Sequence, residues 1–259
     1  REFLIAYNIN LNTSDKKLAS DIALDIREAG RAKRDNRGKI IRDKNNVMVK
    51  VPGTLKTVKA VGWYLDEHNI AQVSMNLVDY KITSMHKAFD EVRSQAQKRG
   101  MRVTGSELVG LVPLEPLLDA GRYFLKKQKK SEGVTDKQLI HIAVKSLGLD
   151  EMYEFNENEK IIEYIIDDKP KLIDKTISSF VDEVSMDSPA PGGGSVSALV
   201  ASLSSGLVSM VANLSYSKKE FNKKRNTINK IALSAQSLKN DFLSLIDKDT
   251  EAFNDLMLS

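Results

Sequence analysis

The sequence contains no cysteine and only three histidines in 259 residues. The lack of cysteine excludes disulfide bonds, thiolate catalysis and cysteine-based zinc sites, and it fits a reducing compartment. His68, His86 and His141 are not spaced as metal ligands, so we expect no bound metal. A basic and then apolar leader is also absent from the first residues, so we expect no signal peptide.

A large excess of charge of either sign is missing as well. Lysine and arginine number 39 against 35 acidic residues, which is too small an excess to indicate a nucleic-acid partner but suits an acidic substrate. Apolar residues make up 41% and charged residues 29% of the chain, as is typical of a well-solvated soluble protein. The length allows two ordinary domains, each with its own core.

Four segments of strand character and two of helical periodicity follow one another in the first part of the chain. The expected strands are residues 3–11, 58–67, 70–79 and 101–108, and the expected helices are residues 14–30, capped weakly by Ser14, and 84–100. Their order, β-α-β-β-α-β, is that of the ferredoxin-like fold, in which two helices cover one face of an antiparallel sheet. The charged residues 31–50 predict a long mobile loop or a ribbon.

The rest of the chain predicts helices almost throughout. They are expected at residues 113–129 and 136–147 and, after a polar, proline-containing linker, at residues 172–185, 195–215 and from about 222 onward. We therefore predict an α+β fold: a ferredoxin-like domain at residues 1–167, a linker at 168–175, and an all-α helical-bundle domain at 176–259 that is incomplete in this chain.

The stretch from Ser188 to Ser217 contains no charged residue. Asp187 precedes it and Lys218 follows it. Residues 196–214 have the length of a membrane span, but the serines within and beside them make a poor one. Apolar side chains form one stripe and small side chains form another face, which favours a buried helix of a soluble bundle or dimer over a membrane segment. The stripe is Leu199, Leu203, Leu207, Met210 and Leu214, and the small face is Ala198, Ala201, Ser202, Ser205, Ser209 and Ala212.

Three glycines, Gly192, Gly193 and Gly194, stand at the start of this helix in the sequence PGGGS. The lysine of a phosphate-binding loop is missing, and so is the strand that precedes a dinucleotide-binding turn. Free N–H groups at a helix N-terminus suit a carboxylate or phosphate, whereas a flexible turn between two helices needs no ligand. The residues leave both interpretations open.

Asp249 falls within an apolar seam of the last helix, whereas Asp247 lies about 200° around the helix and should face solvent. A carboxylate in an apolar seam is costly unless it is paired or used, so Asp249 is the best general acid/base candidate of the chain. The alternative is a buried aspartate whose partner is a serine or asparagine of a neighbouring helix. The seam comprises Leu238, Phe242, Leu245, Ile246, Ala252, Phe253 and Leu256.

A Pro-Gly turn followed by Lys56 and Lys59 enters the second strand. Such a loop suits an acidic, planar ligand, although solvated lysines beside an ordinary hairpin have the same pattern. His86, near the start of a helix, is suited to proton chemistry or, more commonly, to capping and packing.

Several motifs together resemble known families. FLIAYNINL, PGTLK, VGWYLDE, IAQVSMNL and KIIEYII resemble the C-terminal subdomain of glutamate formimidoyltransferase over nearly all of residues 1–168. FVDEVSMDSPAPGGGSVSALVASL, SYSKKEF and LIDKDTEAF resemble the beginning of formimidoyltetrahydrofolate cyclodeaminase. In this order they are similar to the bifunctional formimidoyltransferase-cyclodeaminase family.

The resemblance implies two folate-dependent activities, those of a transferase and an ammonia lyase. One moves the formimino group from N-formimino-glutamate to tetrahydrofolate, and the other cyclises the product to 5,10-methenyltetrahydrofolate with loss of ammonia, as part of histidine degradation. It also implies a cytoplasmic protein whose substrate is tetrahydrofolate, with or without a polyglutamate tail. We expect no nucleic-acid partner and no membrane, and a homo-oligomer formed through the helical domain.

The same resemblance assigns residues. The family's folate-contacting turn matches Gly53, Thr54 and Leu55, although the family usually has a basic residue at the position of Thr54. The family's cyclodeaminase acid/base aspartate matches Asp249. PGGGS and SYSKK match family motifs too, but the resemblance assigns them no role. From their N–H groups and charges we expect contacts with the folate tail at Gly192, Gly193, Gly194, Lys218 and Lys219.

The transferase histidine of the family is expected upstream of Arg1, so neither His68 nor His86 takes its role. The chain is accordingly expected to be a fragment that by itself catalyses neither reaction. Two alternatives remain: the helical half is a methenyltetrahydrofolate cyclohydrolase, or the protein is a non-catalytic scaffold or membrane-associated protein.

Overall fold

A computed structural model describes residues 3–166 and 171–258, which form two compact units. The first contains the residues up to Phe124 together with Leu139–Ile166. The second contains Leu125–Gln138 and the residues described after 170. Leu125–Gln138, which the sequence placed with the first domain, thus belongs by its contacts to the helical unit.

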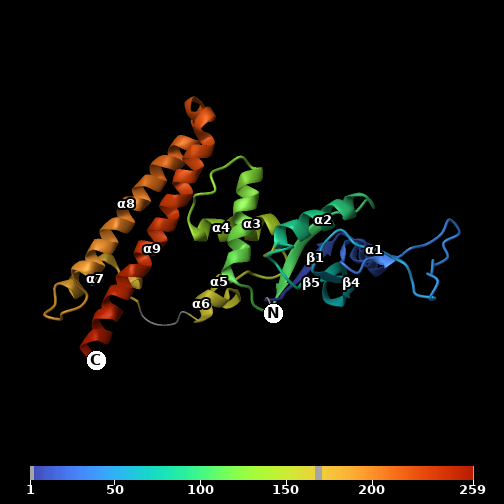
Figure 1. Ribbon diagram of the computed structural model, residues 1–259, viewed down its shortest axis with the longest axis horizontal. Coiled ribbons are helices and arrows are strands. Elements are labelled where there is room, and N and C mark those ends of the chain that lie inside the picture. Colours follow the sequence, from blue (N-terminus) through green and yellow to red (C-terminus); the bar gives the residue numbers. More distant parts are fainter. Residues whose placement is uncertain (1–2, 167–170, 259) are drawn as a thin grey trace. The chain divides into compact units, whose positions relative to one another are not determined.

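A four-stranded antiparallel sheet forms the centre of the first unit (Figure 1). The strands lie in the order β4-β5-β1-β6, and α1 (Lys16–Ile26) and α2 (Met85–Gln97) connect them as the sequence predicted. The predicted ferredoxin-like arrangement is therefore confirmed. The strands are β1 (Ile5–Leu11), β4 (Val58–Leu65), β5 (Ile70–Leu77) and β6 (Val103–Val109).

One face of this sheet forms the core because alternate residues of each strand point to it. On β1 these are Ile5, Tyr7, Ile9 and Leu11, all fully buried, and α1 and α2 pack their apolar residues in the same cluster. The hydroxyl of Tyr7 donates to Ser106 Oγ at 2.9 Å, and burial raises the pKa of Tyr7 above its usual range. A buried polar group is thereby satisfied within the core.

The N-cap of helix α1 lies one residue later than predicted. Asp15, and not Ser14, is the N-cap, and its carboxylate accepts from Lys17 N at 2.7 Å. Aspartate and serine are similarly good caps, so the pattern alone does not choose between neighbours.

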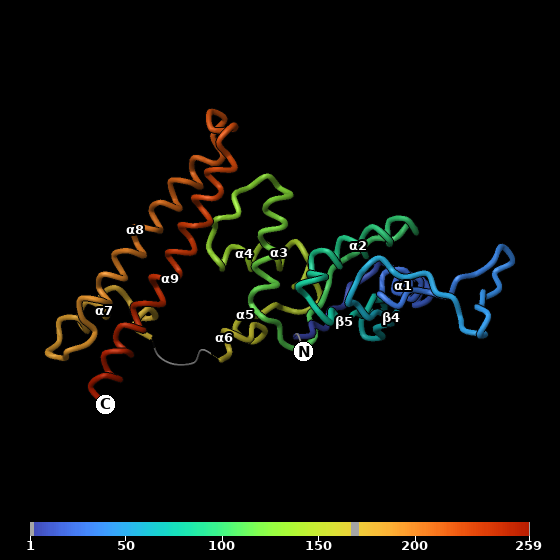
Figure 2. Tube along the Cα trace, in the orientation of Figure 1, coloured from blue at the N-terminus to red at the C-terminus, as the bar shows by residue number. Residues whose placement is uncertain are grey.

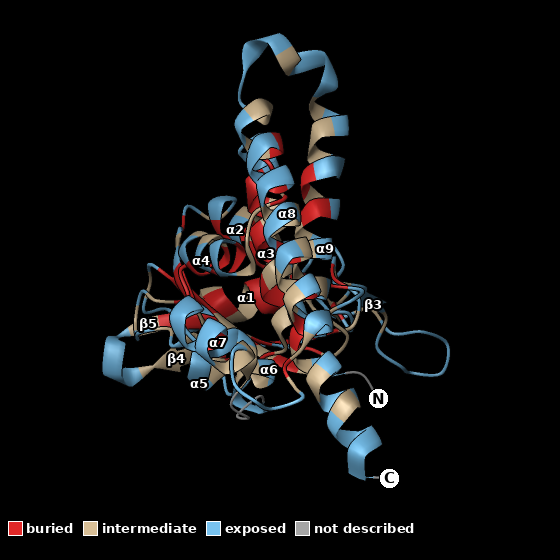
Figure 3. Cartoon of the chain, turned by 90° about the vertical axis from the view of Figure 1, so that its left-hand side faces the viewer, coloured by how far each residue is buried: buried red, intermediate tan, exposed pale blue. Residues whose placement is uncertain are grey.

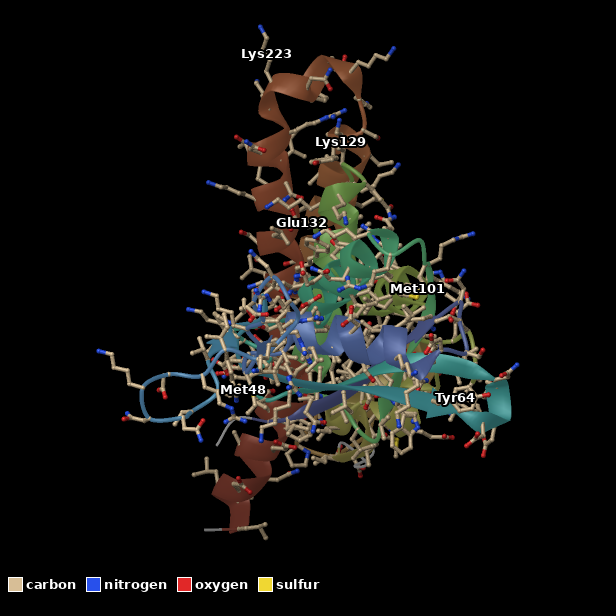
Figure 4. The ribbon with its side chains drawn as sticks, turned by 90° about the vertical axis from the view of Figure 1, so that its right-hand side faces the viewer. Met48, Tyr64, Met101, Lys129, Glu132 and Lys223 are labelled. Atoms are coloured by element: carbon tan, nitrogen blue, oxygen red, sulfur yellow. The ribbon has the colours of Figure 1, made fainter. Side chains whose placement is uncertain are left out.

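The charged stretch after α1 is a hydrogen-bonded ribbon. β2 (Arg31–Ala32) pairs with β3 (Lys50–Val51), and two further bridges join Arg34 to Ile40 and Arg42 to Met48. Figure 2 shows the ribbon as a narrow excursion between α1 and β4, and Figure 4 labels Met48 within it. Of the two predicted alternatives, the ribbon is confirmed.

The connection between β4 and β5 overlaps the gap between the two predicted strands, residues 58–67 and 70–79. The short 3-10 helix η1 (Asp66–His68) is followed by Asn69 in the left-handed region, with φ of 52°. Asparagine tolerates this conformation better than most residues, which is why the reversal falls here.

Four helices follow β6 in the first part of the chain; the first two match the predicted helices at residues 113–129 and 136–147, and the last two were not predicted. They are α3 (Leu114–Lys127), α4 (Asp136–Leu147) and the short α5 (Glu157–Lys160) and α6 (Ile162–Ile166). α3 and α4 approach closely at Gly121, where a Cβ atom would lie 2.3 Å from the carbonyl oxygen of Leu139. The predicted linker falls partly on residues 167–170, outside the described residues.

The helical unit is built around two long helices that run side by side in opposite directions (Figure 1). They are α8 (Gly193–Tyr216) and α9 (Arg225–Leu258), and the shorter elements are η2 (Leu172–Asp174), α7 (Ile177–Val184) and η3 (Lys219–Lys224). α8 turns its small residues to α9: Ser195, Ala198, Ser202, Ser209 and Ala212 are buried, as are Ala232, Ala235 and Ile246 of α9 (Figure 3).

Most of the leucine stripe of α8 is exposed, although Leu199 at its start packs in the cluster that contains Ile246 of α9. Leu203, Leu207 and Leu214 are each about 60% exposed, because α9 packs on the small-residue face, where two helix axes can come closest. The expected burial of α8 therefore holds only for one face. By length and composition α8 would suffice to cross a bilayer, a test that core helices of soluble proteins also pass.

A segment between α3 and α4 docks on this pair of long helices. The carbonyl oxygen of Gly133 accepts from Asn213 Nδ2 at 2.8 Å and from Ser209 Oγ at 3.3 Å. Asn229 Oδ1 accepts from Glu132 N at 2.9 Å. A Cβ atom at Gly133 would lie 2.4 Å from that of Ala232, so only glycine permits this approach.

We predict that Gly133→Ala lowers the free energy of unfolding of the chain by about 1–3 kcal/mol, because the added methyl group overpacks the contact with α9. Gly206→Ala on α8 is the matched control, since no atom lies within 4 Å of its Cβ position. It should stabilise the chain by up to about 1 kcal/mol through helix propensity. Urea unfolding measures both values. An unchanged free energy of unfolding in Gly133→Ala would contradict the close contact of Gly133 with α9.

Candidate functional site

The carboxylate of Asp249 lies against the first turn of α8. Ser195 donates to Asp249 Oδ2 from its backbone N–H at 2.8 Å, and Ser195 Oγ lies 3.1 Å from the same oxygen. The first N–H groups of a helix have no partner within the helix, so a carboxylate here satisfies one of them and is favoured by the helix dipole. The PGGGS turn therefore holds an anion that belongs to the chain itself.

The hydroxyl of Ser195 has further partners on α9. It lies 2.9 Å from the carbonyl oxygen of Ile246, to which it can donate, and 3.2 Å from Thr250 Oγ1. Ser195 is fully buried, so these contacts fix its side chain. The alternative predicted for Asp249 was a serine or asparagine partner on a neighbouring helix, and the partner is Ser195 of α8.

The predicted burial of Asp249 is wrong. Asp249 is exposed, and Asp247, predicted to face solvent, is partly buried and accepts from Leu172 N at 2.6 Å. α9 buries Ile246 against α8, whereas Leu245 and Asp249 lie at the edge of this contact and stay exposed, although Asp249 still reaches Ser195. The periodicity identified an apolar seam but not which part of it has a neighbour.

A hollow of about 470 Å³ adjoins this carboxylate. Its walls combine apolar and small side chains with one carboxylate and one ammonium group. A flat ring system can pack on such walls while the carboxylate exchanges a proton with it. The lining residues are Gly194, Ser197, Ala198, Ala201, Phe242, Leu245, Lys248 and Asp249.

The two groups expected to contact the folate tail lie at opposite ends of α8. The glycines stand at its start, and Lys218 and Lys219 follow its last residue, Tyr216. The helix has 24 residues, which at 1.5 Å per residue is about 36 Å. Figure 4 labels Lys223 at the lysine end. The groups do not form one site within a single copy of the chain, and each stays a prediction on its own.

The turn at Gly53, Thr54 and Leu55 packs on the end of α1. Thr54 N donates to the carbonyl oxygen of Asp25 at 3.0 Å, and Leu55 N donates to that of Ile26 at 2.9 Å. These two donors cap α1 and are therefore not available to a ligand. Leu55 itself is buried in the core, and Thr54 Oγ1 donates to Glu91.

A hollow of about 560 Å³ lies close to this turn, between the end of α1 and the edge strand β4. Arg27, Lys59 and Glu28 contribute its charged groups, and Thr57 and Val61 are among its other lining residues. Of the two lysines that the sequence suggested for an acidic ligand, Lys59 lines this hollow and Lys56 does not.

The second face of the sheet carries polar residues that the sequence analysis missed. Gln72 lies between Asn10 and Trp63 in the register, and its Nε2 donates to Asn10 Oδ1 at 2.8 Å. Asn10 and Gln72 are 1% exposed, whereas Trp63 is half exposed. The signal was present in YNINL and AQVSMNL, where amides and serine alternate with apolar residues instead of charges.

The histidines make local contacts. His86 lies 2.9 Å from Ser84 Oγ and stacks on Tyr123 with ring centroids 4.2 Å apart, which is the capping and packing alternative. His68 Nε2 lies 3.0 Å from the hydroxyl of Tyr153. Within residues 3–166 and 171–258, no three histidine or acidic side chains are grouped as metal ligands.

Comparison with known families gives two matches along the chain. The family model described as "Formiminotransferase domain" matches residues 6–167, and that described as "Formiminotransferase-cyclodeaminase" matches residues 176–259.

Curated relatives match the same regions. The chain is 41% identical over 256 residues to formimidoyltransferase-cyclodeaminase of Mus musculus, which covers 98% of the chain and 44% of that protein. It is 35% identical over 133 residues to glutamate formimidoyltransferase of Thermoplasma acidophilum, a match that covers 51% of the chain and 37% of that protein. It is also 31% identical over 83 residues to methenyltetrahydrofolate cyclohydrolase of Methylorubrum extorquens, a match that covers 32% of the chain and 40% of that protein.

We predict that Gly53→Ala destabilises the first unit by about 1–3 kcal/mol, because its Cβ would lie 2.0 Å from the carbonyl oxygen of Arg27. Thr54→Ala is the neighbouring control, since it removes only an exposed side-chain bond, and it should cost less than about 1 kcal/mol. Thermal or urea unfolding measures both. Equal stability of the two variants would contradict the packing described for this turn.

Proposed function

Since the chain belongs to the formiminotransferase family, we propose that it forms part of a folate enzyme that transfers a formimino group to tetrahydrofolate and then cyclises the product with release of ammonia. The chain spans 44% of the length of the mouse relative that it matches. The activity is accordingly proposed for the intact protein that carries this sequence. The observation that supports the second reaction best is the carboxylate of Asp249, held at the start of α8 beside an apolar hollow.

In the proposed cyclisation Asp249 acts as acid and base. The formimino group on N5 of the folate enters protonated, and N10 forms a bond to its carbon. Asp249 takes the proton from N10 and gives it to the former imino nitrogen, which leaves as ammonia when its bond to carbon breaks. The charge of the protonated formimino group remains on the methenyl product, so atoms and charges balance.

The residues of the hollow suit a folate. Phe242, Leu245 and Ala201 offer apolar surface for the pterin and benzoyl rings, and Lys248 offers a cation to the carboxylates of the glutamate tail. Gly192, Gly193, Gly194, Lys218 and Lys219 remain proposed contacts for a longer polyglutamate tail, each at its own end of α8.

For the transfer reaction, we place the acidic substrates near the first unit's charged hollow and the polar face of its sheet. Arg27 and Lys59 supply positive charge to glutamate carboxylates. Gly53 and Thr54 remain proposed folate contacts through groups other than the Thr54 and Leu55 N–H, and Leu55 through its backbone carbonyl.

A cyclohydrolase is the second candidate for the helical unit, because a relative of that name is 31% identical over 83 residues. It would add water to the methenyl product and release no ammonia. We further propose a cytoplasmic protein that assembles into homo-oligomers through its helical domain, with no membrane and no nucleic-acid partner. The exposed leucine stripe of α8 supports such an assembly.

The test uses the intact protein that carries this chain, with N-formimino-glutamate and tetrahydrofolate. We predict that Asp249→Asn lowers the rate of ammonia release at least about 100-fold, because the proton carrier is lost, while the rate of glutamate release is unchanged. Asp241→Asn is the matched control on the same helix. Coupled assays for ammonia and glutamate measure both steps.

The outcomes separate the candidates. Full ammonia release by Asp249→Asn would contradict the acid/base role. Hydrolysis of methenyltetrahydrofolate without ammonia release from formimino-tetrahydrofolate would favour the cyclohydrolase. Absence of both activities in the unaltered protein would leave the scaffold alternative.

A further inference from the structure

We propose that Gly194 and Ser195 are positioning residues for Asp249, which bind one oxygen of its carboxylate and keep the other free to exchange the proton. This inference rests on the proposed function of Asp249. It gives the PGGGS turn a role that differs from both interpretations of the sequence, a site for an external anion and a flexible turn between helices.

The bound oxygen is Oδ2. Both polar groups of Ser195 approach it, the backbone N–H at 2.8 Å and Oγ at 3.1 Å. The hydroxyl carries one proton, which it can donate either to Oδ2 or to the carbonyl oxygen of Ile246 at 2.9 Å, so the backbone N–H is the donor that always faces Oδ2. Hydrogen bonds to a carboxylate are stronger than neutral ones, so this arrangement fixes both the rotation and the position of the group.

The free oxygen is Oδ1. Among the described residues, no donor forms a hydrogen bond to it, and it lies directly beside Gly194, one of the residues that line the hollow. A proton acceptor must lie within hydrogen-bond reach of its substrate, and only an oxygen not already occupied by the chain can do so. Oδ1 is therefore the oxygen that takes the proton from N10 and returns it to the leaving nitrogen.

Gly194 makes room for this arrangement. A Cβ atom at position 194 would lie 2.1 Å from Oδ1 and 2.4 Å from Cγ of Asp249. Contacts this short are not possible, so any larger residue must displace the carboxylate. Glycine is therefore required at position 194 because the carboxylate of Asp249 occupies the space of a Cβ atom, and this reason does not depend on the flexibility of the turn.

The test compares four variants in the intact protein. Ser195→Ala should lower kcat for ammonia release about tenfold. Gly194→Ala should lower it about 100-fold, because misplacement of a reacting group by about 1 Å can lower a rate by about that factor. KM for formimino-tetrahydrofolate should stay within about twofold in Ser195→Ala. The controls are Ser204→Ala, whose hydroxyl donates only to Val200 O of its own helix, and Gly206→Ala, which has open space.

A merely structural role would give different results. It would lower the melting temperature and the transferase rate together with kcat, whereas a positioning role leaves the transferase rate unchanged. The inference is overturned if Ser195→Ala and Gly194→Ala keep the full kcat while Asp249→Asn is inactive, and in that case the proposed function stands. If Asp249→Asn is fully active, the proposed function fails and this inference fails with it.

Discussion

The helical unit depends on the close approach of α8 and α9 along a face of small side chains. Alanine and serine leave the helix axes free to approach, so that Ser195 of α8 meets Ile246 on α9. One turn further along α9, the same approach brings the carboxylate of Asp249 to the first N–H groups of α8. The position of the candidate acid/base group therefore follows from helix packing. A bulky side chain in the small face would separate the serine from the aspartate.

The same constraint explains two other features of this unit. Because α9 takes the small-residue face, Leu203, Leu207 and Leu214 of α8 lie beside this contact and expose most of their surface, which another surface can cover. Near the other end of the pair, Gly133 fits against Ala232 because neither has a large side chain. Residues 125–138, which belong by sequence to the region matched by the formiminotransferase model, are thereby part of the helical unit.

Local periodicity predicted the helices and strands well. It predicted less well the burial and hydrogen bonds that depend on which distant segment of the chain lies beside a residue. The strand alternation and the Gly and Asn signals fixed the order and the turns of the first unit, including the reversal at Asn69. The pattern around Asp249 located a seam, but burial depends on which neighbouring element covers it. Within the described part of the chain, Ile246 is fully buried, Phe242 and Phe253 are half-buried, and the other seam residues are exposed. Likewise, the sequence does not reveal that the N–H groups of Thr54 and Leu55 bind the end of α1, because the pattern of the turn carries no sign of that neighbour. The pairing of Ser195 with Asp249 spans 54 positions and has no local signal.

The most direct test of the central claim is a double-mutant cycle between Ser195 and Asp249, measured by urea unfolding of the chain. The single variants Ser195→Ala and Asp249→Asn and the combined variant give the coupling energy between the two side chains. If the hydroxyl of Ser195 binds the carboxylate as described, the coupling is about 1 kcal/mol in favour of the native pair. Additivity of the two substitutions to within about 0.3 kcal/mol would contradict the account.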